Sequence, residues 1–208
     1  MKYFAAALFF CCIACNEQQK PSTPTTIQKD TITPVAKEIA NPYEPVDVSP
    51  MDMSYLPVDY PKLKMAKAIT TPPIARVIYS RPHRQGRKIF GNLLKWGEPW
   101  RLGANEATEI DLFQPITIQN KKIPQGRYIL YCIPQENSWT LVFNSNIDSW
   151  GLKPDPQKDL FSFQIPVQHS DTTAEYFTIV FQPTAANNRS ANLIMAWDDV
   201  VAKLLINY

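Results

Sequence analysis

The sequence is poor in histidine, glycine and charge. Its 208 residues include two histidines and six glycines, and 19% are charged, against about 25% in a typical soluble protein. Neither His83 nor His169 stands in a metal-ligand spacing or in a Gly-x-Ser-x-Gly context. The chain also lacks a phosphate-binding loop and a dinucleotide fingerprint. We therefore expect no metal ion and no cofactor.

Charge of one sign is also missing. The chain has 21 basic and 19 acidic side chains, for a formal net charge of +2. A general nucleic-acid-binding protein would be clearly basic. The near balance therefore excludes nucleic acid as an expected partner.

Three of the four cysteines lie among the first 15 residues. One lysine precedes an uncharged apolar run that is too short to span a membrane and that ends in Ile13-Ala14-Cys15. This ending resembles a lipobox, so we expect residues 1–14 to be a lipoprotein signal peptide and Cys15 to carry the acyl chains (palmitate among them). Multiple acyl chains anchor a protein stably. The alternatives to cleavage before Cys15 are cleavage before Cys12 and an ordinary signal peptide without lipid. The expected location is the bacterial cell envelope, at the outer membrane or a periplasmic face.

Removal of the signal would leave Cys132 as the only other cysteine. The expected domain thus has no internal disulfide, although its compartment is oxidising. Cys132 stands in an apolar run, residues 128–133. A buried, unreactive thiol is the expectation for it.

Residues 15–61 are expected to form a disordered tether. Eight prolines and many threonines interrupt every periodicity there. Within this tether, Asp30-Thr31-Ile32 resembles an O-glycosylation pattern of bacterial envelope proteins, which makes Thr31 a candidate modification site. Residues 51–63 are more apolar than the rest and are expected to lie along the domain as a strand.

The remaining residues, 62–208, predict one all-β domain. Short segments alternate between polar and apolar side chains, which is typical of half-buried strands. About nine such strands and almost no helix indicate a single antiparallel β-sandwich or an open barrel. The last segment could be a strand or a short helix, and a strand is preferred because Asp198-Asp199 has the composition of a turn. The expected strands are 74–80, 108–113, 116–119, 127–133, 139–143, 160–167, 176–181, 191–197 and 200–206.

A connection of about 25 residues separates the first two strands of this series, and loops of that length are usually functional or packed on themselves. This connection and the chain after it contain the motifs Tyr79-Ser80-Arg81-Pro82, Gly86-Arg87-Lys88-Ile89-Phe90-Gly91, Trp100-Arg101-Leu102-Gly103-Ala104-Asn105-Glu106-Ala107-Thr108, Lys122-Ile123-Pro124-Gln125-Gly126-Arg127-Tyr128, Trp139, Asn144, Trp150-Gly151 and Asp159. Together these motifs resemble the domain-of-unknown-function 2911 family of bacterial envelope proteins over residues 65–206. The resemblance implies one domain in the envelope and no particular activity.

The long connection also holds the candidate ligand-binding residues. Arginine recognises carboxylates and phosphates, and tryptophan offers a stacking face. An amide and an acid follow shortly after. The candidates are Arg81, Arg87, Trp100, Arg101, Asn105 and Glu106.

Two other interpretations of these residues stay open. The connection could be pinned by an ion pair from Arg81 or Arg101 to Glu106, with the tryptophans in the core, and for Arg101 this structural role is the expectation. Alternatively, Glu106 could act with Asp111 or Asp159 as a carboxylate pair in glycoside hydrolysis. Ser80 near His83 is not taken as a catalytic pair, because such groups are recognised by geometry.

The sequence therefore predicts a membrane-tethered, non-enzymatic module that binds an anionic or sugar-like small ligand or a partner protein. A hydrolase of envelope glycans using Glu106 is one alternative. A purely structural lipoprotein is the other.

Overall fold

The computed structural model describes residues 47–184 and 189–208. The elements are β1 (Met51–Leu56), α1 (Tyr60–Met65), β2 (Ala75–Ser80), β3 (Thr108–Leu112), β4 (Ile116–Ile118), β5 (Lys121–Ile123), β6 (Gly126–Pro134), β7 (Ser138–Asn144), a 3-10 turn (Pro156–Lys158), β8 (Asp159–Pro183) and β9 (Ser190–Asn207). Cys15 and Thr31 lie outside the described residues.

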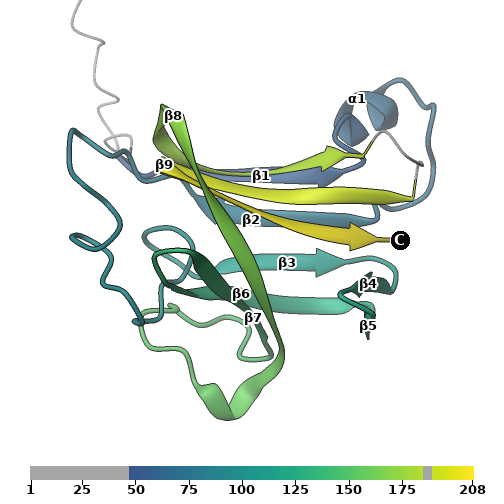
Figure 1. Ribbon diagram of the computed structural model, residues 1–208. Coiled ribbons are helices and arrows are strands. Elements are labelled where there is room, and N and C mark those ends of the chain that lie inside the picture. The colour runs from purple at the N-terminus through teal and green to yellow at the C-terminus, as the bar shows by residue number, and fades with distance from the viewer. Residues whose placement is uncertain (1–46, 185–188) are drawn as a thin grey trace, which may run out of the picture. The chain divides into compact units, whose positions relative to one another are not determined.

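The nine strands of the described residues belong to one open antiparallel sheet, in the order β1-β2-β3-β6-β7-β8-β9-β4-β5. The expected all-β antiparallel class is confirmed. Strand β8 joins the two halves of the sheet, because residues 159–166 pair with β7 and residues 167–183 pair with β9. Figure 1 shows β8 crossing the domain diagonally and ending beside β1 and β9. There the amide of Phe181 donates to Ser54 Oγ (3.3 Å), so the sheet curls back toward its first strand.

Two of the strands are much longer than the alternation suggested. β8 has 25 residues and β9 has 18, and each merges two segments that were expected to be separate. The turn expected at Asp198-Asp199 was wrong. Asp198 instead has a positive φ of 56° inside β9 and pairs with Ala174, where the register of β8 shifts. Asp tolerates this conformation, so the two acids mark an irregularity within a strand and not its end.

The first part of the domain also differs from expectation. The strand expected over residues 51–63 is confirmed for Met51–Leu56 only, and α1 follows it with Pro61 in its first turn, a favoured place for proline. The sheet therefore begins before residue 62, the boundary that composition suggested. The prolines around Met51–Leu56 placed this strand within the expected tether, residues 15–61, although proline is compatible with the ends of an edge strand.

Strand β4 forms a hairpin with β5, a short strand that was not among those expected from the sequence. β4 and β5 are joined at Gln119 and Asn120, which both have positive φ. This is the geometry of a two-residue type I′ turn. β6 starts only at Gly126 and pairs with β3 and β7 instead.

The core consists of the inward-facing alternate residues of these strands. At one end it is aromatic: the rings of Phe90, Trp100, Trp139, Phe177 and Trp197 contact one another, and each residue is at most 6% exposed. The Cys132 thiol is fully buried, which raises its pKa and agrees with an unreactive thiol. This aromatic end positions the site described below.

Three buried tyrosines predict that the fold weakens at alkaline pH. Burial raises the pKa values of Tyr79, Tyr128 and Tyr131, and the hydrogen bond from Tyr131 to Asp159 (2.7 Å) adds to the effect. These folded-state pKa values lie above the unfolded value of about 10. The contribution of the three phenols to the free energy of unfolding is therefore complete below pH 10 and is lost as the pH rises further. The slope is at most about 1.4 kcal/mol per pH unit for each phenol.

Urea unfolding at a series of pH values measures this effect. The free energy of unfolding should fall above about pH 10, and the Tyr131→Phe variant should fall less steeply over that range. Equal slopes for the two proteins would contradict the role of Tyr131.

Candidate functional site

The connection between β2 and β3 is fixed to the sheet along its whole length. Ser80 Oγ bonds both to the amide (2.6 Å) and to the carbonyl oxygen of Ala104. Trp100 and Cys132 exchange backbone hydrogen bonds of 2.7 and 2.8 Å. The amide of Ile89 donates to Asp198 Oδ2 (3.1 Å). The connection is thus an ordered part of the domain.

Trp100 lies at the centre of this region. Its ring stacks on Trp197, with centroids 5.8 Å apart and planes at 24°, and its edge-on neighbours are Phe90, Trp139 and Phe177. Its indole N–H donates to the carbonyl oxygen of Gly103 (3.0 Å). Trp100 is therefore held in one orientation in the core, as the structural interpretation expected. The same expectation was wrong for Trp96, the other tryptophan of the connection, which is 39% exposed.

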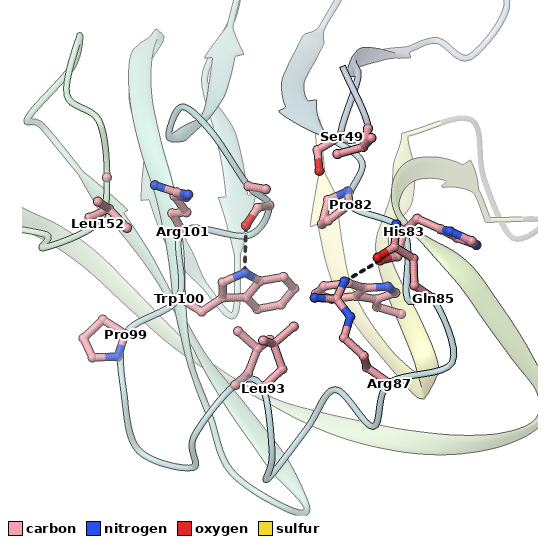
Figure 2. Close-up of a pocket in the computed structure, with 16 residues that line it drawn as sticks. Ser49, Pro82, His83, Gln85, Arg87, Leu93, Pro99, Trp100, Arg101 and Leu152 are labelled. Atoms are coloured by element: carbon pink, nitrogen blue, oxygen red, sulfur yellow. Dashed lines mark hydrogen bonds between the residues drawn. The ribbon is translucent and has the colours of Figure 1, made fainter. Parts of the chain in front are cut away.

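A cavity of about 450 Å³ opens beside Trp100 and Trp197. This volume suits a small organic molecule. Figure 2 shows Trp100 with Arg101 next to it, and with Leu93 and Arg87 close by. The lining residues are Val48, Ser49, Pro82, His83, Gln85, Arg87, Leu93, Leu94, Pro99, Trp100, Arg101, Gly103, Ala104, Gly151, Leu152 and Trp197.

The charged side chains of the cavity are all basic. Arg87 and Arg101 line it, His83 adds an imidazole, and its lining includes no Asp or Glu. His83 itself stacks on Tyr176 at 4.4 Å and lies 3.5 Å from a carboxylate oxygen of Glu175. The cavity therefore combines an aromatic, apolar wall with two full positive charges.

These two arginines differ from others in the domain. Arg76, Arg81, Arg84 and Arg127 each form an ion pair with a carboxylate. Within residues 47–184 and 189–208, neither Arg87 nor Arg101 lies within 4.0 Å of one. Arg87 donates to the carbonyl oxygens of Arg84 (2.9 Å) and His83 (2.7 Å), which directs its guanidinium along the cavity rim.

Arg101 is the more buried of the two. Its guanidinium lies 5.9 Å from the ring of Trp150 and makes one long hydrogen bond, 3.5 Å, to the carbonyl oxygen of that residue. Burial lowers its pKa, and the more distant charge of Glu106 raises it only in part. The cation is thus partly desolvated, and no acidic side chain of the described residues is in contact with it, which favours an incoming anion.

The other candidate residues lie outside the cavity lining. Arg81 binds Asp52 (3.0 Å), Thr178 (3.1 Å) and the carbonyl oxygen of Phe177 (3.3 Å), so its donors are used within the fold. Asn105 donates to Asp47 (2.7 Å) and thereby holds the segment that precedes β1. The structure brings Arg87, Trp100 and Arg101 together, and it separates Arg81, Asn105 and Glu106 from them.

The expected ion pair to Glu106 is not formed by Arg81 or by Arg101 in the described part of the chain. Glu106 is exposed and is not in the cavity lining. Thr108, two residues on, closes the motif by donating to the carbonyl oxygen of Leu102 (2.6 Å). The motif therefore holds its shape through backbone hydrogen bonds and not through its charges.

The carboxylates considered as partners of Glu106 are engaged elsewhere. Asp111 pairs with Arg76, and Asp159 accepts from Tyr131 and Asn144. Ser80 is buried and bonded to Ala104, which agrees with reading it as structural. Among the described residues no group of three His, Cys, Asp or Glu side chains could hold a metal ion, and no helix is long and apolar enough to cross a membrane.

The wall residues that the sequence analysis missed include Trp197 on β9, Leu93 in the connection and Leu152 after β7. Trp197 fits the alternation of an inward-facing strand residue, so the pattern indicated a core position and not a place in the cavity wall. Leu152 is 65% exposed, and only its neighbour Trp150-Gly151, part of the quoted motifs, pointed to this loop.

The comparisons with known proteins agree with the family resemblance that the sequence motifs indicated. The family model described as "Protein of unknown function (DUF2911)" matches residues 61–206, more than two thirds of the sequence. The chain belongs to the DUF2911 family. The match begins in α1 and takes in every cavity residue except Val48 and Ser49. No curated protein and no solved structure matches the chain. The description of the DUF2911 family brings no activity with it, so the function must be argued from the site.

Proposed function

We propose that the domain binds a small anionic ligand with a flat apolar body in the cavity beside Trp100. The observation that carries this proposal is the placement of Arg87 and Arg101 in the same apolar cavity, with no carboxylate of the described residues in contact with either. Arg87 is exposed, but Arg101 is half-buried, and a half-buried cation normally has a partner. A carboxylate or phosphate on a ligand would supply it in the bidentate geometry that arginine favours.

The walls support the second half of the proposal. Leu93, Leu94 and Pro99 offer apolar contact to the body of a ligand, and the small accessible parts of Trp100 and Trp197 (6% and 2% exposed) complete this wall. Ligand sites in general are mostly apolar, with a few polar groups that fix orientation. A sugar-like anion would meet the same wall. The proposed ligand class is therefore an anionic group carried on a flat body.

This module would act at the cell envelope, where Cys15 would tether it to a membrane through lipid. That part of the proposal depends on the apolar run ending at Cys15, which resembles a lipobox. A role for Glu106 as a hydrolytic acid is not proposed, because that side chain is exposed and away from the cavity.

Two dyes of nearly equal shape test the proposal. Anilinonaphthalene sulfonate is an aromatic anion, and N-phenylnaphthylamine is its uncharged counterpart. Both fluoresce when they enter an apolar site. We expect the anion to bind at least about tenfold more tightly, since one charge-assisted contact is worth about 1.5–3 kcal/mol. Fluorescence titration of the chain from residue 15, carrying Cys15→Ser, measures both dissociation constants. Equal affinities would overturn the anionic part of the proposal.

A further inference from the structure

The mouth of the cavity is surrounded by exposed apolar side chains. Val48 (73% exposed), Leu93 (47%) and Leu152 (65%) all line the cavity and face outward at its rim. Trp150, 56% exposed, lies beside Arg101. Isolated exposed apolar residues need no explanation, but a cluster of large ones around one opening marks an interaction surface.

The cations near this rim are also unpaired. Arg87 and Arg101 line the opening, Lys95 lies beside Leu94 in the sequence, and Lys153 follows Leu152; both lysines are exposed. None of the four forms an ion pair with a carboxylate in the described ranges. Leucine and tryptophan interleaved with lysine and arginine is the composition of surfaces that lie in a membrane interface.

The chain also enters the domain at this rim. Asp47 is the first described residue, and its carboxylate accepts from Asn105 (2.7 Å) and from the amide of Ser49 (2.7 Å). Val48 and Ser49 then contribute to the cavity wall. All residues that precede the domain, including Cys15, are therefore joined to it at the mouth of the cavity.

We infer that this rim docks the domain onto an anionic lipid surface, with Val48, Leu93, Trp150 and Leu152 entering the interface and the cations facing the headgroups. The cavity would then open toward the membrane, and its anionic ligand would be an amphiphile drawn from it. This inference rests on the proposed function, because Arg87 and Arg101 serve both. It adds a second membrane contact, made by protein side chains and independent of an acyl chain.

Vesicle flotation tests the inference with the chain from residue 15 carrying Cys15→Ser, so that lipid on that cysteine cannot contribute. We expect at least about tenfold stronger binding to phosphatidylcholine vesicles containing about 30% phosphatidylglycerol than to phosphatidylcholine alone. The difference should shrink as salt rises above about 0.1 M, because salt screens exposed charges.

The chain offers a matched control for the apolar rim. Leu93 and Leu205 are exposed to nearly the same degree (47% and 48%), but Leu205 lies on β9 away from the cavity lining. The Leu93→Ser and Leu152→Ser double variant should lose about tenfold or more in binding to the anionic vesicles. The Leu205→Ser variant should bind as the parent does.

Two outcomes would overturn the inference: equal binding to both kinds of vesicle, or equal losses in the rim variant and the Leu205→Ser variant. Thermal melts of all variants establish that they are folded. The proposed function fails separately, because the dye titration contains no lipid. Binding of the sulfonate without binding to vesicles would support a soluble anion as the ligand and would contradict docking of the rim on a membrane.

Discussion

Replacing Gly151 with alanine is expected to lower the free energy of unfolding by about 3 kcal/mol. Gly151 has a φ of +78°, a region that costs residues with a Cβ about 1–2 kcal/mol. An added Cβ would also lie 2.7 Å from the Cβ and 3.0 Å from the Cα of Ala107, and 3.2 Å from the Cβ of Arg101. These are backbone atoms and the base of a side chain, so they cannot rotate away. Urea unfolding measures the loss.

Gly86 is the matched control for this prediction. Its φ is +70°, but an added Cβ would meet no atom within 4 Å. The Gly86→Ala variant should therefore lose only the conformational part, about 1–2 kcal/mol. The difference between the two variants isolates the close contact that holds the Trp150-Gly151-Leu152 loop against Arg101. Similar losses in both variants would show that this contact is not tight.

The fold class could be predicted because its signal is local. Alternation of polar and apolar residues identified β2, β3, β6 and β7 to within one or two residues. The same pattern could not predict that two alternating segments belong to one continuous strand. β8 and β9 run through polar and irregular positions such as Asp198, whose φ of 56° is compensated by distant partners: Oδ2 accepts from the amide of Ile89 and Oδ1 from Arg84. No residue near Asp198 in the sequence indicates that these two partners will contact it.

The site was predicted only in part, for a related reason. Residue types identified Arg87, Trp100 and Arg101, which the structure brings to one cavity. The same reasoning also selected Arg81, because an arginine paired with Asp52 looks in the sequence like one without a partner. Which arginines are satisfied depends on contacts between segments far apart in the chain. The expected pair of Arg101 with Glu106 failed because the backbone turns at Asn105, with a φ of 59°, and Glu106 faces solvent.

The central claim is that Arg87 and Arg101 together attract an anion into the cavity. Changing both to glutamine removes their charges and leaves shorter polar side chains that can still donate hydrogen bonds. Two lost charge-assisted contacts of about 1.5 kcal/mol each correspond to about a hundredfold in affinity. Binding of uncharged N-phenylnaphthylamine should be unchanged, since the Trp100 and Trp197 wall is intact, and this serves as the control for the cavity.

Arg127 provides the comparison for charge alone. It forms ion pairs with Glu109 (2.5 Å) and Asp148 (3.1 Å) and is not in the cavity lining, so Arg127→Gln changes the net charge of the domain without touching the site. The deciding measurement is the dissociation constant of anilinonaphthalene sulfonate for the parent, the Arg127→Gln variant and the Arg87→Gln, Arg101→Gln double variant. We predict a loss of about a hundredfold in the double variant only. A double variant that binds the anion as tightly as the Arg127→Gln variant would contradict the assignment of this cavity as an anion site.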